Sequence, residues 1–128
     1  MTVSSHPSSH RIKVGSKYIG EGEPTFFIAE IGNNHNGDYY LAKRTIDEAV
    51  KAGADAVKFQ NFKARRVTSR YAKKPEYQKK NTPRRGTMLD MLEALELDDE
   101  DYYELYEYAV KKNITFLSTP KDIISARL

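Results

Sequence analysis

The chain has 128 residues, of which 39% are hydrophobic and 30% charged, a composition typical of one globular domain or of part of a larger one. It contains no cysteine, which excludes disulfide bonds and thiolate metal sites, and no apolar run approaches the roughly 18 residues needed to span a membrane. The net charge of +3 is mild, and we expect a cytoplasmic protein without a membrane partner.

The N-terminal part is predicted to contain a leader, a hairpin, a strand and a helix. Residues 1–10 lack the apolar stretch of a secretory signal, so we expect a disordered leader there. Residues 11–24 hold two short runs around a Gly-Ser pair, which predicts a β-hairpin followed by a turn. The apolar run 25–31 is typical of a buried strand. The apolar spacing after it predicts a helix that Asp38 caps and Gly53 ends.

The rest of the chain repeats this alternation. The predicted elements are a strand over 54–60, a polar connection over 61–87, a helix over 88–95, a helix after Asp98, a strand over 114–118 and the start of a helix over 122–128. Asp98 and Asp101 have the spacing of a capping box. The apolar face of that helix is predicted to comprise Tyr102, Leu105, Tyr106, Ala109 and Val110. Strands that alternate with helices imply an α/β fold with a parallel sheet.

Polar side chains occur where the predicted strands end, and in parallel α/β folds ligands bind beyond these ends. The residues at these ends are Glu30, Asn33, Asn34, His35 and Asn36 for the first strand, Lys58, Gln60 and Asn61 for the second, and Ser118 and Thr119 for the third. A lysine suits a phosphate or carboxylate, and a carboxylate suits proton transfer or metal contact. Because a charge in such a place is costly unless it is paired, we expect Glu30 and Lys58 to meet.

Each candidate also has a purely structural interpretation. Glu30 and Lys58 would then form an ion pair without chemistry, and His35 would be a hydrogen-bonded histidine in a loop rich in asparagine. Ser118 and Thr119 would mark only the exit of a strand. Spacing alone therefore does not select a reaction.

Residues 61–86 contain ten Lys or Arg residues and one acidic residue, Glu76. Such a run attracts nucleic acid or a phosphorylated small molecule, and it is also typical of a solvated loop. The basic residues are interleaved with only three aromatic residues, Phe62, Tyr71 and Tyr77. Single-stranded nucleic acids bind by stacking their bases on aromatic side chains, and this segment offers few of them. We therefore expect no nucleic-acid partner.

Four motifs together, FIAEIGNNHNGD, ADAVKFQ, EYQKKNT and FLSTP, resemble the nonulosonic acid synthases. This family includes N-acetylneuraminate (sialic acid) synthase and its legionaminic and pseudaminic acid relatives. The resemblance covers residues 12–128, and the motifs follow the family's order and spacing. It implies that residues 25–128 are the N-terminal portion of a TIM (β/α)₈ barrel, namely its first three βα units, preceded by the β-hairpin.

The resemblance also implies a reaction and its residues. The family condenses phosphoenolpyruvate with an N-acetylated amino sugar, N-acetylmannosamine or a related hexosamine, free or 6-phosphorylated, and releases phosphate. Glu30 would contact the sugar or the attacking water as the catalytic residue, and Lys58 would bind phosphoenolpyruvate. Asn81 would lie in a loop that closes over the phosphate. Gln60 and Ser118 would line the same opening, with Asn34, His35 and Thr119 as further pocket-lining candidates.

The family further implies a divalent metal, Mn²⁺ or Mg²⁺, with ligands outside this chain, and a homodimer of the full-length protein. Two residues depart from its usual pattern: Lys121 stands where an aromatic residue is usual, and Asn61 where threonine is common. Because a barrel takes about 250 residues, we expect this chain to be an incomplete barrel that is inactive by itself. The alternative is a non-catalytic fragment that acts as a binding, complementing or self-associating module.

Overall fold

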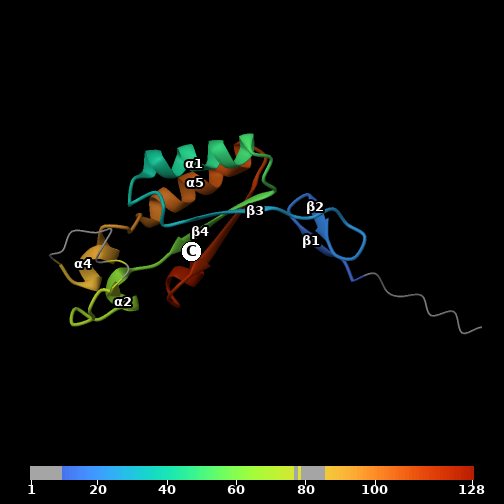
Figure 1. The fold of residues 1–128 in the computed structure, drawn as a ribbon. Helices are drawn as coiled ribbons and strands as arrows, with labels where there is room; N and C mark the ends of the chain where they lie inside the picture. Colours follow the sequence, from blue (N-terminus) through green and yellow to red (C-terminus); the bar gives the residue numbers. More distant parts are fainter. Residues whose placement is uncertain (1–9, 77, 79–85) are drawn as a thin grey trace, which may run out of the picture.

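The computed structural model describes residues 10–76, 78 and 86–128 as a β-hairpin and a three-stranded parallel sheet, with two long helices along one face of the sheet (Figure 1). In chain order the elements are β1 (Ile12–Val14), β2 (Lys17–Ile19), β3 (Ile28–Gly32), α1 (Tyr39–Lys51), β4 (Ala56–Asn61), α2 (Ala64–Val67), α4 (Met88–Glu93), α5 (Asp99–Lys111), β5 (Thr115–Pro120) and the 3-10 helix η1 (Ser125–Arg127). The predicted α/β fold with a parallel sheet is confirmed. Residues 1–9 of the predicted leader, and Asn81, lie outside the described residues.

The hairpin lies at the N-terminal end of the sheet (Figure 1). Strands β1 and β2 pair antiparallel, as predicted, and Gly15 turns between them with φ +58°. Lys17 forms an ion pair with Asp55, and the Asp55 carboxylate also accepts a hydrogen bond of 2.7 Å from the backbone N–H of Phe27. These contacts hold the hairpin at the end of the sheet opposite to the strand ends where a ligand is expected.

The sheet has the order β3-β4-β5, and all its strands run parallel. Val57 and Phe59 of β4 are fully buried with Ile46 of α1 and Leu105 of α5, in a core between the sheet and the two helices. Because side chains alternate along a strand, Lys58 on β4 is directed to the other face. Packing of the core therefore decides which polar side chains remain accessible.

Local sequence signals set the first and last residues of the helices as predicted. Asp38 caps α1 by accepting a hydrogen bond of 3.0 Å from the N–H of Leu41, and Gly53 follows the helix with φ +80°. Asp98 and Asp101 form the expected capping box at the start of α5. These helix boundaries depend on contacts within four residues, which sequence patterns capture.

The prediction for the apolar face of α5 was wrong in part. Leu105 and Ala109 are buried as predicted, whereas Tyr106 is 52% and Val110 56% exposed. The buried residues face the sheet and α1. The side chain of Tyr106 instead lies at the margin of the sheet, where its ring meets Phe116 of β5 edge-on at 6.1 Å. The predicted face was therefore wider than the face that the core covers.

The end of the chain also differs from the prediction. Instead of the first turns of an α-helix over residues 122–128, the segment contains the short 3-10 helix η1. The Asp122 carboxylate accepts hydrogen bonds from the N–H and the hydroxyl of Ser125 and from the N–H of Ile124, which tightens the turn. These bonds, those of Ser125 above all, lower the pKa of Asp122 to about 2. In the part of the chain that the structure describes, no helix is long and apolar enough to cross a membrane.

Candidate functional site

Glu30 and Lys58 form an ion pair between two neighbouring parallel strands, near the middle of each strand. Glu30 of β3 is paired in register with Lys58 of β4, and Lys58 Nζ lies 2.8 Å from Glu30 Oε2. This confirms the pairing expected from the sequence. The side chains are 49% and 36% exposed, so the pair contributes only about 0–1 kcal/mol to stability. Both charges are accessible to a ligand.

These residues lie on one face of the sheet, which we call the polar face: the face turned away from α1 and α5, carrying Glu30, Lys58, Gln60 and Thr119. Gln60 follows Lys58 by two residues on β4, and Thr119 of β5 is its register partner. Residues at such spacing and pairing are directed to the same side of a parallel sheet. The polar face therefore gathers residues from all three strands of the described sheet.

Gly32 ends β3 at an irregularity in its pairing with β4, with φ +55°. An ideal Cβ atom built on Gly32 would lie 3.5 Å from Glu30 Oε1 and 3.8 Å from Gln60 Nε2. A carboxylate and an amide therefore border the same space above the glycine. Asn33, the next residue, donates a hydrogen bond of 3.3 Å from Nδ2 to Gln60 Oε1. Asn33 was expected among the polar residues at this strand end, but its place in the sequence indicated no role for it.

The structure places the other residues of this loop away from the polar face. His35 is fully buried, its Nδ1 accepts a hydrogen bond of 3.1 Å from the N–H of Gly37, and its ring lies 6.0 Å from that of Phe59 in the core. Burial lowers the pKa of His35, although the charge of Asp38 opposes this shift. Asn34 is exposed and donates to the Ile31 carbonyl at 2.9 Å. These positions favour a structural interpretation of both residues.

Ser118 is not brought to the polar face. Its register partner is Phe59, which belongs to the core side of the sheet, and its hydroxyl donates a hydrogen bond of 2.9 Å to Asn61 Oδ1. Alternation along β5 directs Ser118 and Thr119 to opposite faces, so only Thr119 joins Lys58 and Gln60. The expectation that Ser118 lines the opening beside Lys58 does not agree with this register. The predicted role of Asn81 in a closing loop lies outside the described residues and stays a prediction.

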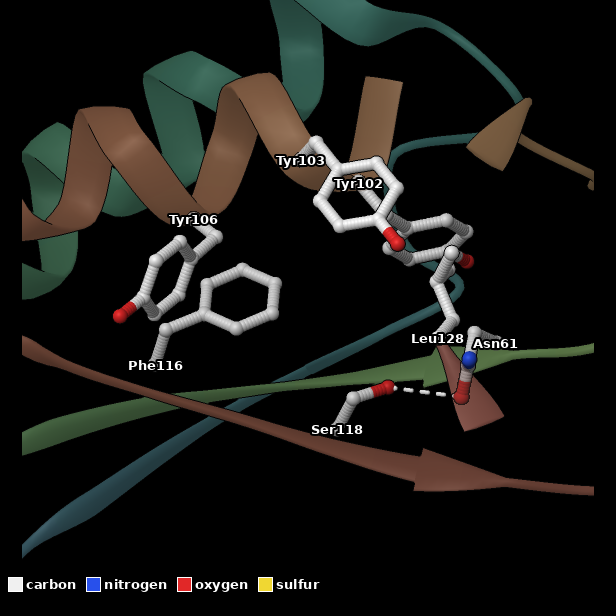
Figure 2. A pocket seen from close by; sticks show the side chains of 7 residues that line it. All are labelled: Asn61, Tyr102, Tyr103, Tyr106, Phe116, Ser118 and Leu128. Atoms are coloured by element: carbon white, nitrogen blue, oxygen red, sulfur yellow. Dashed lines mark hydrogen bonds between the residues drawn. The ribbon is translucent and has the colours of Figure 1, made fainter. Parts of the chain in front are cut away.

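A hollow of about 300 Å³ lies on the opposite, helix-covered face (Figure 2). It is lined by Asn61, Tyr102, Tyr103, Tyr106, Phe116, Ser118 and Leu128. Its buried polar groups already have partners: Asn61 Nδ2 donates to the Ser125 carbonyl at 2.6 Å, and the Tyr102 hydroxyl donates to the Gln60 carbonyl at 2.6 Å. Burial also raises the pKa of Tyr102. A hollow lined by neutral and mostly aromatic side chains suits an apolar surface, and the charged polar face is the better candidate for a polar substrate.

The described residues do not fit a metal site. Within 10–76, 78 and 86–128, no group of three or more His, Asp or Glu side chains is placed to hold a metal ion. Glu30 is engaged by Lys58, and His35 is buried in the core. The divalent metal implied by the family resemblance therefore stays a prediction about residues elsewhere, and no chemical step is assigned to it.

Comparison with known proteins points to one family. The model of the NeuB family matches residues 45–128. The N,N'-diacetyllegionaminic acid synthase of Legionella pneumophila is 48% identical over 114 residues, which are 89% of this chain and 32% of that protein. The enzyme of the same name from Campylobacter jejuni is 51% identical over 104 residues, which are 81% of this chain and 31% of that protein.

A solved structure supports the same comparison. The N-acetylneuraminic acid (sialic acid) synthetase from Leptospira borgpetersenii, in complex with citrate, matches with a TM-score of 0.72 and 33% sequence identity. The match covers 93% of this chain and 37% of that one. The chain thus spans about a third of the length of the curated relatives that it matches.

Proposed function

The chain belongs to the NeuB family, and from this premise we propose that it forms part of the catalytic barrel of a nonulosonic acid synthase. Residues 25–128 would supply the first three βα units of a TIM barrel. The enzyme would be a cytoplasmic transferase, homodimeric at full length, that requires Mn²⁺ or Mg²⁺ held by residues beyond this chain. Its substrates would be phosphoenolpyruvate and an N-acetylated amino sugar.

In the proposed reaction the terminal carbon of phosphoenolpyruvate bonds to the aldehyde carbon of the sugar. Water adds to the neighbouring carbon, phosphate leaves, and a nonulosonic acid forms. The aldehyde oxygen takes up a proton, and the water loses one. The reaction therefore needs a cation that binds an anionic substrate and a carboxylate that manages protons.

The observation that carries the proposal is the contact of 2.8 Å between Glu30 and Lys58 on the polar face. Phosphoenolpyruvate has a phosphate and a carboxylate, which a lysine suits. Lys58 is a cation on the polar face two residues before Gln60, which lies near the C-terminal end of β4, where the ligands of parallel α/β folds bind. Glu30 repels anions and is therefore suited to the uncharged sugar and to the attacking water. Placing the two side by side brings the two substrates into contact. Gln60 and Thr119 would line the same opening.

The acceptor sugar is proposed from the relatives. Two N,N'-diacetyllegionaminic acid synthases are 48% and 51% identical to this chain over the matched residues. This supports an acceptor sugar with two acetamido groups. Its rate of consumption should be compared with those of N-acetylmannosamine and N-acetylmannosamine 6-phosphate in the same assay.

The test is a chimera in which this chain replaces the matching segment of the Campylobacter jejuni synthase. We expect the chimera to release phosphate in step with sugar consumption. Lys58→Ala should raise the KM for phosphoenolpyruvate at least about tenfold, because a charged contact to an anion is lost. Lys51→Ala is the matched control, since Lys51 is 70% exposed on α1 and pairs with Glu48. A folded but inactive chimera, or an unchanged KM in Lys58→Ala, would contradict the proposal.

A second candidate function rests on the exposed apolar margin of α5 and β5. Tyr106 and Val110 are more than half exposed, and Tyr106 lines the hollow of Figure 2. The 128-residue chain would then be inactive by itself and would complement a barrel remainder that is supplied separately. Mixing it with the remaining segment of the Campylobacter synthase distinguishes the two functions: activity that appears only in the mixture favours complementation, and activity of the isolated chain excludes it.

A further inference from the structure

The side-chain amide of Gln60 has a donor end and an acceptor end. Its hydrogen bond with Asn33 decides which of the two ends is directed to the space above Gly32. Asn33 Nδ2 donates to Gln60 Oε1 at 3.3 Å, so the acceptor end is turned toward Asn33. The donor end, Nε2, lies 3.8 Å from the ideal Cβ position above Gly32, and Glu30 Oε1 lies 3.5 Å from the same position. The space above Gly32 is therefore bordered by both a donor and an acceptor.

Gly32 keeps this space free of side-chain atoms. Its φ of +55° lies in the left-handed region that glycine adopts without strain. A larger residue would place its Cβ in contact with both the Glu30 carboxylate and the Gln60 amide. The backbone thus leaves room for a ligand atom where the two polar groups converge.

Asn33 is poorly suited to a role in packing alone. Its Oδ1 is buried and has no hydrogen-bond partner in the part of the chain that the structure describes. An unpaired buried oxygen lowers stability, and an apolar side chain would avoid that loss. The side-chain amide of Asn33 instead donates to Gln60, 27 residues away along the chain. Its placement is therefore explained by the amide that it orients.

We propose that Asn33 is a positioning residue that fixes the polarity of Gln60, so that Gln60 Nε2 donates to a substrate hydroxyl while Glu30 Oε1 accepts from the same hydroxyl. A hydroxyl both donates and accepts, as this space requires. Phosphoenolpyruvate offers anionic acceptor oxygens, which Glu30 repels. The hydroxyl therefore belongs to the acceptor sugar. The identity of this ligand rests on the proposed function, whereas the orientation of the amide does not.

The first test measures the orientation in the 128-residue chain itself. A carboxylate at position 33 accepts but cannot donate, so in Asn33→Asp the Gln60 amide must rotate and present Nε2 to it. NMR of the Gln60 side-chain NH₂ should then show one proton shifted downfield and exchanging more slowly with water. Asn36→Asp makes the same change at an exposed position of the same loop and should leave the signal unchanged. An unaltered Gln60 signal in Asn33→Asp, or an equal effect of Asn36→Asp, overturns the proposal.

The second test measures the consequence in the chimera. Asn33→Asp should raise the KM for the amino sugar at least about tenfold and leave the KM for phosphoenolpyruvate within about twofold. In a Gln60→Ala background the same substitution should have no further effect, because Asn33 acts through Gln60. Equal changes in both KM values, or additive effects, would show a merely structural role. If the chimera without substitutions is inactive, the proposed function fails, while the NMR result still decides the orientation of the amide.

Discussion

The buried amide of Asn61 joins three segments of the chain, and its removal should cost a large part of the stability. Asn61 is 5% exposed at the end of β4. Its Oδ1 accepts a hydrogen bond of 2.9 Å from the Ser118 hydroxyl on β5, and its Nδ2 donates one of 2.6 Å to the Ser125 carbonyl in η1. Asn61→Ala removes both bonds and leaves that carbonyl without its donor.

The magnitude follows from these two bonds. Each buried hydrogen bond contributes about 1 kcal/mol net, and an acceptor left unpaired adds to the loss, so we expect a decrease of about 2–3 kcal/mol in the free energy of unfolding. For a chain of this length, 1 kcal/mol corresponds to about 4 °C in Tm, which gives a decrease of about 10 °C. Urea unfolding followed by circular dichroism at low protein concentration measures the loss directly.

Ser118→Ala provides the internal comparison, because it removes only one of the two bonds and should cost about 1 kcal/mol. The double variant should match Asn61→Ala within about 0.5 kcal/mol, since both substitutions remove the same Ser118–Asn61 bond. A loss below about 0.5 kcal/mol in Asn61→Ala, or an equal loss in Ser118→Ala, would refute the reasoning.

Three further outcomes are expected. Lowering the pH from 7.5 to 5 should reduce the free energy of unfolding, because burial lowers the pKa of His35 in the folded state below the ordinary 6.5. The contribution of His35 to stability is complete above pH 6.5 and is lost as the pH falls from 6.5 toward the folded-state pKa. Urea titrations should show this pH dependence in His10→Gln and not in His35→Gln. Gly37→Ala should lower Tm by several degrees, because φ is +73° and the new Cβ would meet the Ala94 carbonyl; an unchanged Tm would contradict the tight contact. Val110→Lys should weaken concentration-dependent self-association in size-exclusion chromatography, because it places a charge on the exposed apolar side of α5; an unchanged elution profile would exclude this surface.

Much of the framework could be predicted because its signals are local. The cap at Asp38 and the box of Asp98 and Asp101 depend on hydrogen bonds within three residues, and a left-handed turn at Asn113, with φ +57°, follows α5. The pairing of Glu30 with Lys58 was also predictable, because both residues lie at matching positions of short strands that a parallel sheet aligns.

Other features required the tertiary structure. The register of β4 with β5 directs Ser118 toward Asn61 and Thr119 toward the polar face, and no sequence period specifies that register. The contact between Asn33 and Gln60 joins residues 27 positions apart, so nothing within either segment indicates it.

The sequence by itself thus determined the order of strands and helices, their caps and the charges at the strand ends, since these depend on neighbours along the chain. Only the tertiary structure decided which side of the sheet each polar residue faces and how the Gln60 amide is turned. Those choices depend on packing between segments that are distant in the sequence.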